Sequence, residues 1–176
     1  MTDELTQLAL AAGAGDRAAL SEFIRRSQSE VWRFVARAAG VGAADDLTQE
    51  TYLRVLGALP GFQGRASART WLLSIARRVV IDRIRYDTVR PQLIGMDAVD
   101  LELLAAGSGD ADRLVVEETL ATLDPDRRVA LVLTQLMGFS YAEAAEICGC
   151  PVGTVRSRVA RARAELVGRR ELGVLS

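Results

Sequence analysis

Between Phe139 and Leu166, the residue types and spacing suit recognition of a nucleic acid. Ser140 and Glu143 form a predicted capping box at the start of a short helix. Gly149 marks a tight turn, and Pro151 opens the next helix. Two short helices joined in this way are typical of a helix-turn-helix, in which the second helix enters the major groove of DNA.

The second helix of this pair separates an apolar stripe from a polar surface. Val155, Val159 and Ala162 recur at helical spacing, so we expect them in the core. The candidate DNA-binding residues are the polar and small residues on the other faces: Gly153, Thr154, Arg156, Ser157, Arg158, Arg161 and Arg163. We predict that Arg158 points toward bases, and that Arg161 and Arg163, further along, are better placed for phosphates. The alternative is an ordinary helical hairpin with a charged outer face.

A second polar cluster occupies residues 45–50. Leu47 belongs to an apolar stripe, so Asp46, Gln49 and Glu50 share the outer surface of a helix. The carboxylates of Asp45, Asp46 and Glu50 could bind a divalent metal, but the sequence has no histidine, and acids at a helix start are favoured by its dipole. We therefore predict a solvated face or a docking face for a basic partner, with no metal and no cofactor.

A third cluster combines a small-residue loop, an aromatic ring and arginines. Six arginines stand against Asp82 alone between Arg65 and Arg85. A loop of small residues beside Trp71 and these cations could hold unstacked bases of a single strand. The alternative is that Trp71 is a core residue, because it shares a helical stripe with Ile75 and Val79.

The near-neutral net charge of −1 hides an uneven distribution. Residues 1–86 carry a net charge of +3, residues 87–112 carry −5 and residues 113–176 carry +1, and every one of the 22 basic residues is arginine. Two basic regions that flank an acidic segment indicate two surfaces for a polyanion, joined by a spacer.

Helical periodicity dominates the sequence, and no stretch shows the sustained alternation of a strand. We expect an all-helical fold of two small domains, residues 1–88 and 113–176, joined by a flexible acidic linker over residues 89–112. The expected helices are a short one before Gly13 and longer ones over about 16–39, 44–59, 67–86, 115–123, 125–137, 140–147 and 151–166.

Composition excludes several classes of protein. The 49% hydrophobic content is too high for a disordered chain, and no apolar run approaches the roughly 18 residues of a membrane span. The acidic N-terminus shows no secretory signal. Cys148 and Cys150 are expected to be reduced thiols of a cytoplasmic protein rather than a disulfide or a metal site.

Three stretches, in order, resemble the bacterial sigma-70 family and specifically its small extracytoplasmic-function (ECF) group. They are Asp46-Leu47-Thr48-Gln49-Glu50, Ser67-Ala68-Arg69-Thr70-Trp71-Leu72 and the segment from Gly149 to Arg158. The last stretch alone is shared with response-regulator-type activators, but the ordered triple is specific. The resemblance covers about residues 5–90 and 113–170. The amino acids at residues 31–35 and 148–150 are similar to those of the actinobacterial sigma C branch.

The resemblance implies a protein that is not an enzyme but directs core RNA polymerase to promoter DNA. In the family, an acidic helix face docks on the coiled coil of the β′ subunit, and we expect contacts to both the β′ and β subunits. Here the docking face falls on Asp46, Gln49 and Glu50, with Arg54 nearby. Anti-sigma factors are common partners in this group, although nothing in this sequence encodes one.

The resemblance also implies how the promoter is read. The first domain binds the minus-ten element as a non-template single strand, with these residues: Phe62, Gly64, Arg65, Ser67, Arg69, Trp71, Arg77, Arg78 and Arg85. The helix from Pro151 reads the minus-thirty-five element, and the acidic linker threads the polymerase channel. Housekeeping sigma factors carry two adjacent tryptophans for melting, whereas Leu72 follows Trp71 here. This departure fits promoters with strict sequence needs.

Two rival functions make different predictions. A response-regulator-type activator would carry a receiver domain with alternating strands, and residues 1–90 show no such pattern. A metal-dependent nuclease built on Asp45, Asp46 and Glu50 would cleave DNA in the presence of magnesium.

Overall fold

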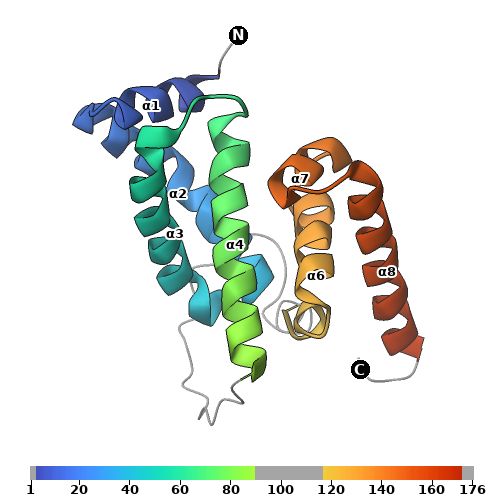
Figure 1. The fold of residues 1–176 in the computed structure, drawn as a ribbon. Coiled ribbons are helices and arrows are strands. Elements are labelled where there is room, and N and C mark those ends of the chain that lie inside the picture. Colours follow the sequence, from blue (N-terminus) through green and yellow to red (C-terminus); the bar gives the residue numbers. More distant parts are fainter. Residues whose placement is uncertain (1–2, 90–116, 172–176) are drawn as a thin grey trace.

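A computed structural model describes residues 3–89 and 117–171, and within these ranges every regular element is a helix (Figure 1). The expected linker over residues 89–112 lies almost entirely outside the described residues. The all-helical class predicted from periodicity is therefore confirmed for the described part of the chain.

Four helices build the N-terminal domain: α1 (Glu4–Gly13), α2 (Arg17–Ala39), α3 (Ala44–Ala58) and α4 (Ala68–Val89). Single turns of 3₁₀-helix at Val41–Ala43 (η1) and Leu59–Gly61 (η2) flank α3. Phe23, Phe34 and Leu73 are among the largest side chains of the core and are fully buried. α2 packs against α1, α3 and α4, so it forms the centre of this domain.

Side chains that the sequence marks as caps begin these helices. The Asp16 carboxylate accepts hydrogen bonds from two backbone N–H groups at the start of α2. Gly40 ends that helix with a φ of 89°, a backbone conformation that side chains with a Cβ rarely adopt. The Ser67 hydroxyl accepts from the Thr70 N–H in the first turn of α4. α4 extends to Val89, three residues beyond the predicted end.

The C-terminal domain is built from α6 (Pro125–Leu131), α7 (Tyr141–Cys148) and α8 (Val152–Glu171), preceded by a helical segment over residues 117–121. The predicted single helix from Pro125 to Met137 is wrong in its second half, because Val132–Leu136 (η4) form a π-helix. There the Met137 N–H donates to the Val132 carbonyl, five residues back. α8 also runs past its predicted end near Leu166.

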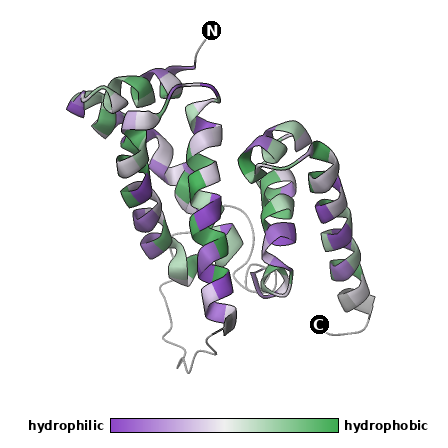
Figure 2. Cartoon of the chain, in the orientation of Figure 1, coloured by the Kyte–Doolittle hydropathy of each residue, from purple (hydrophilic) through white to green (hydrophobic). Residues whose placement is uncertain are grey.

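The helix-turn-helix of α7 and α8 forms as its sequence indicates. Ser140 and Glu143 make both hydrogen bonds of the capping box. Gly149 has the left-handed conformation, with a φ of 61°, and provides the turn. Val155, Val159 and Ala162 are buried, as predicted. Figure 2 shows hydrophilic residues recurring along α8 and along α3, on the surfaces of the two domains.

The two domains pack against each other through α4, which contacts α6 and α7 (Figure 1). Two arginines hold the domains together by binding carbonyls at helix ends. Arg37 of α2 donates to the Leu136 carbonyl at 3.0 Å, and buried Arg128 of α6 donates to the Ala38 carbonyl at 3.0 Å. A carbonyl at a helix C-terminus lacks an intrahelical partner, so each arginine satisfies a group that the opposite domain leaves free.

Candidate nucleic-acid and polymerase interfaces

The predicted acidic face lies on the outer side of α3. Asp46 and Gln49 are exposed, and the Glu50 side chain is 44% exposed, while Leu47 is buried in the core beneath them. The same helix also exposes two large apolar side chains, Leu53 and Leu56. The face that α3 presents is therefore acidic at its start and apolar toward its end, a combination that suits protein docking.

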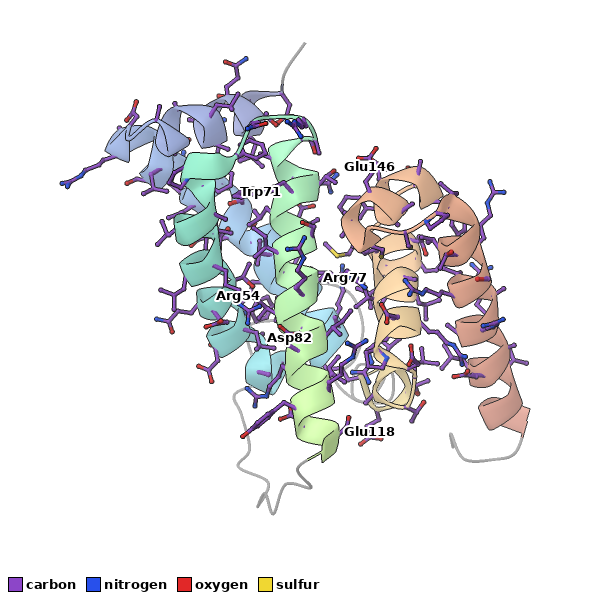
Figure 3. All side chains as sticks on the ribbon, viewed as in Figure 1. Arg54, Trp71, Arg77, Asp82, Glu118 and Glu146 are labelled. Atoms are coloured by element: carbon purple, nitrogen blue, oxygen red, sulfur yellow. The ribbon has the colours of Figure 1, made fainter. Side chains whose placement is uncertain are left out.

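Arg54 links this face to α4. Its guanidinium lies 2.8 Å from a Glu50 oxygen and 3.1 Å from an Asp82 oxygen, and Figure 3 shows Arg54 and Asp82 between α3 and α4. The hydrogen bonds that Arg54 donates to Glu50 and then to Asp82 raise the pKa of Arg54. Arg54 thus joins α3 to α4 through two ion pairs.

The carboxylates of residues 45–50 do not gather around a common point. Asp45 turns back to accept a hydrogen bond from the Trp32 indole N–H at 2.7 Å, and Glu50 turns to Arg54. Within residues 3–89 and 117–171, no three His, Cys, Asp or Glu side chains come together as metal ligands would. This geometry gives the nuclease alternative no structural support.

The loop over residues 62–67 brings two aromatic rings together. The centroids of Phe62 and Trp71 are 4.7 Å apart with an interplanar angle of 37°, and both rings are half-buried against the core. The interpretation of Trp71 as a core residue is therefore met in part, because the ring packs against the core, and the accessible part of the ring lies beside the loop. Its binding of unstacked bases stays a prediction. Gly64 has a φ of 67°, which favours glycine at this point of the loop.

The arginines of this region differ in their surroundings. Arg65, Arg78 and Arg85 are exposed. Arg69 instead pairs with Glu30 of α2 and lies over the Phe139 ring of the C-terminal domain, 4.1 Å from its centroid. The hydrogen bonds that Arg69 donates to the Glu30 carboxylate raise the pKa of Arg69.

Asp126, in the first turn of α6, gathers arginines from both candidate DNA-binding surfaces. Its carboxylate lies 2.6 Å from Arg77, 3.5 Å from Arg158 and 3.6 Å from Arg85. We call these four residues the Asp126 cluster. Figure 3 shows Arg77 extending from α4 toward the C-terminal domain. Arg158 pairs with Asp126 and also contacts the Cys150 thiol at 3.6 Å. The expectation that Arg158 is free to point toward bases is therefore wrong in this conformation.

The outward face of α8 carries most of the other residues predicted to bind the duplex. Gly153, Arg156, Ser157, Arg161 and Arg163 are exposed, and Thr154 is half-buried. The Arg156 guanidinium lies over the Tyr141 ring of α7, 5.9 Å from its centroid. Arg163 donates to the Gln135 side chain. The exposed residues lie on the side of α8 that faces away from the buried stripe of Val155, Val159 and Ala162.

Sequence reasoning missed the partners that these arginines have inside the chain. In the sequence, Asp126 is one of many acids that occur in the first turn of a helix, and Phe139 has the pattern of a core residue before a capping box. Nothing in the local pattern links either residue to α4, about 50 or more positions earlier in the chain. Cys148 and Cys150 are both free thiols, and burial raises the pKa of Cys148 to about 11.

Comparison with known proteins defines the class. The family model described as Sigma-70 region 2 matches residues 23–89, and the model described as Sigma-70, region 4 matches residues 113–166. The chain belongs to the sigma-70 family of RNA polymerase sigma factors, within its ECF group. Such proteins are transcription initiation factors and not enzymes.

Individual relatives agree with this membership. The chain is 53% identical to the ECF RNA polymerase sigma factor SigC of Mycobacterium tuberculosis over 94% of this chain and 90% of the relative, consistent with a SigC-like branch. It is 33% identical to the ECF RNA polymerase sigma-E factor of Escherichia coli over 93% of each chain. The resemblance inferred from the three motifs is thereby confirmed.

Two solved complexes contain a chain with the same fold. CnrH in complex with the cytosolic domain of CnrY matches with a TM-score of 0.69 and 26% identity, over 97% of this chain and 99% of that one. The sigma factor RpoE of Bartonella quintana, in complex with the anti-sigma factor NepR, matches with a TM-score of 0.67 and 27% identity, over 88% and 97% of the two chains. Among the helices that the structure describes, none is long and apolar enough to cross a membrane.

Proposed function

We propose that this sigma factor divides its work between two domains. Residues 1–88 bind core RNA polymerase and the single-stranded minus-ten element, and residues 113–176 bind the duplex minus-thirty-five element. Residues 89–112 connect them along the polymerase channel. Family membership over both matched regions supports this division, and the exposed polar face of α8 is the single observation that carries it.

The polymerase contact falls on the outer face of α3. Asp46, Gln49 and Glu50 present acidic and polar groups to a basic partner surface, which we assign to the β′ coiled coil, with the β subunit as a further partner. Charge complementarity of this kind sets orientation and speeds encounter. The exposed Leu53 beside these residues adds apolar area that a docked helix would cover.

The promoter contacts fall on arginines and aromatic rings. The accessible edges of Phe62 and Trp71, with exposed Arg65 and Arg78 beside them, suit stacking and phosphate contacts to a single strand. On α8, the exposed residues suit the major groove of a duplex. Arg69 and the arginines of the Asp126 cluster become available for DNA contacts once their contacts inside the chain open.

We also propose an anti-sigma factor as a regulatory partner and the cytoplasm as the site of action, where core polymerase is found. One structural relative, the sigma factor RpoE of Bartonella quintana, was solved in complex with the anti-sigma factor NepR, which supports a partner of this kind.

In vitro transcription tests the proposal directly. Purified core polymerase is combined with this chain and with a set of candidate promoters, and the expected result is RNA that starts at a subset of these promoters and depends on the added chain. A chain that binds core polymerase but supports no promoter-dependent RNA would contradict the proposed function.

A further inference from the structure

Helix α1 lies outside residues 23–89, which the Sigma-70 region 2 model matches, yet it contacts the loop that leads into α4 (Figure 1). We propose that Thr6 of α1 is a positioning residue for the capture of the minus-ten strand. Through Thr6, α1 holds the start of α4 and the loop over residues 62–67 in the geometry that binds bases. This inference rests on the proposed minus-ten role of that loop.

A chain of hydrogen bonds joins α1 to the start of α4. The Ala68 N–H donates to the Thr6 hydroxyl at 2.7 Å, and the Thr6 hydroxyl donates to an Asp3 carboxylate oxygen at 2.6 Å. A threonine hydroxyl has only one hydrogen, so these directions follow from the donor inventory. Thr6 is 1% exposed and Ala68 is fully buried, so both groups are shielded from solvent.

The Ala68 N–H is a group that α4 cannot satisfy by itself. The first four N–H groups of an α-helix have no intrahelical acceptor. Ser67, the local cap, accepts from the Thr70 N–H and leaves Ala68 to the acceptor on α1, 62 positions away in the sequence. Because a buried donor without a partner is strongly unfavourable, the position of the first turn of α4 depends on Thr6.

Close packing joins α1 to both ends of the same loop. A Cβ built on Gly64 would lie 3.5 Å from a methyl of Leu10 and 3.8 Å from the methyl of Thr6, so the backbone of the loop passes close to these two side chains of α1. A Cβ built on Gly13 would lie only 2.5 Å from the Leu59 carbonyl oxygen, so α1 also approaches the η2 turn that precedes the loop.

These contacts determine the relation between the groups assigned to strand binding. Phe62 follows η2 and Trp71 lies in the first turn of α4, so the contact between their tilted rings requires both ends of the loop to stay in place. The hydrogen bond from Thr6 lowers the pKa of Asp3, so Asp3 remains ionised near neutral pH and polarises the hydroxyl that receives the Ala68 N–H.

The test compares holoenzymes assembled from core polymerase with the parent chain, Thr6→Val or Thr6→Ser. The probe is a fluorescent single-stranded oligonucleotide with the non-template minus-ten sequence of a promoter that the parent transcribes. Thr6→Val keeps the shape and removes the hydroxyl, and should weaken binding about five- to ten-fold. Thr6→Ser keeps the hydroxyl and should bind close to the parent.

Two further variants separate positioning from general stability. Thr51 of α3 is also fully buried, but its hydroxyl bonds to the Leu47 carbonyl within its own helix, so Thr51→Val should leave minus-ten binding unchanged. Leu10 is 39% exposed, so Leu10→Ala should fold even if Thr6→Val does not, and should weaken binding about two- to three-fold through the lost contact with Gly64.

Affinities for core polymerase and for the minus-thirty-five duplex are measured in parallel. Selective loss of minus-ten binding in Thr6→Val, or in Leu10→Ala if Thr6→Val does not fold, with these two affinities retained, supports the inference. Parent-like minus-ten binding by Thr6→Val, or by Leu10→Ala if Thr6→Val does not fold, overturns it, and so does an equal loss of all three affinities. If the parent holoenzyme itself does not prefer the minus-ten oligonucleotide over a scrambled one, the proposed function of the loop fails instead.

Discussion

At the residue scale, the arginines of this protein divide by the partner that each one has inside the chain. Arg156 and Arg161 of α8 are exposed on the outward face, whereas Arg158, between them in the sequence, turns to Asp126 and Cys150. The helical turn of about 100° per residue separates their directions. Arg158 can contact DNA only after it leaves Asp126, so the exposed arginines are the first candidates for base contacts.

Substitution of α8 arginines should distinguish base reading from phosphate attraction. Arg161 was expected to contact a phosphate, but it is exposed whereas Arg158 is paired with Asp126, so we now assign base reading to Arg161. Arg161→Ala should weaken binding to a matched minus-thirty-five duplex by about 1–3 kcal/mol and relax preference at one base pair. Arg163→Ala should weaken all sequences alike and lower the salt slope by about one unit. Fluorescence anisotropy over salt and base-substituted duplexes provides both measurements. If Arg158→Ala relaxes base preference and Arg161→Ala does not, the original assignment to Arg158 is restored.

The exposed Asp46 provides a test of polymerase docking. Asp46→Arg should weaken the affinity for core polymerase at least several-fold, because a reversed charge opposes a basic partner surface. Asp46 is exposed at the start of α3, so thermal unfolding should stay close to that of the parent. Asp46→Asn serves as the matched variant with an intermediate loss. Co-purification of Asp46→Arg with core polymerase at the parent level would refute the docking assignment.

At the scale of single elements, the capping box of α7 makes the stability of the helix-turn-helix depend on pH. The hydrogen bonds from Ser140 lower the pKa of Glu143 below its ordinary value. A carboxylate with a lowered folded-state pKa contributes stability above its unfolded pKa and loses it as the pH falls through the folded pKa. The contribution of this cap is therefore present at neutral pH and disappears in acid.

Glu143→Gln should accordingly destabilise the chain more at pH 7 than at pH 3. Urea unfolding of the two proteins at both values measures the difference, which should be below about 1 kcal/mol at pH 7 for an exposed cap. Ser140→Ala removes the other half of the box and should cost about 1 kcal/mol at neutral pH. An unfolding free-energy difference between Glu143→Gln and the parent that is equal at both pH values would contradict the role of the ionised carboxylate.

At the scale of the whole molecule, the packing of the two domains engages both candidate DNA-binding surfaces at once. The Asp126 cluster joins Arg77 and Arg85 of α4 to Arg158 of α8, and Arg69 of α4 lies over Phe139. The Asp126 carboxylate forms ion pairs with guanidinium groups that could otherwise bind a phosphate. Release of Arg77 from Asp126 and of Arg69 from Phe139 therefore requires the domains to separate. Arg158 pairs with Asp126 inside the C-terminal domain, so its release requires only that this ion pair opens.

Asp126→Asn should weaken this packing by removing the charge that the three arginines share. The expected result is a roughly three- to ten-fold higher affinity of the free chain for the minus-thirty-five duplex and a larger radius of gyration in small-angle scattering. Asp124→Asn is the matched control, because it removes one negative charge from the same turn and asparagine caps a helix as well as aspartate. Equal gains from both substitutions would show a general charge effect and no role for the cluster.

The sequence by itself determined the class of fold, most helix starts and the family. Helical periodicity, the Asp16, Asp124 and Ser140 caps and the left-handed Gly149 are local features, so their effects follow from a few neighbouring residues. The buried stripe of Val155, Val159 and Ala162 was predictable for the same reason. The π-helix over residues 132–136 was not predicted, because nothing in the sequence pattern marked it.

Only the tertiary structure decided which polar residues are engaged within the chain. The Thr6–Ala68 hydrogen bond, the Asp126 cluster and the Arg128–Ala38 contact join residues about 30 to 90 positions apart. Such pairs depend on how whole helices cross, and helical periodicity describes one helix at a time. The sequence therefore indicated which arginines are candidates for DNA binding, while the packing of α4 against α6 and α7, and of α6 against α8, determined which of them have partners inside the chain.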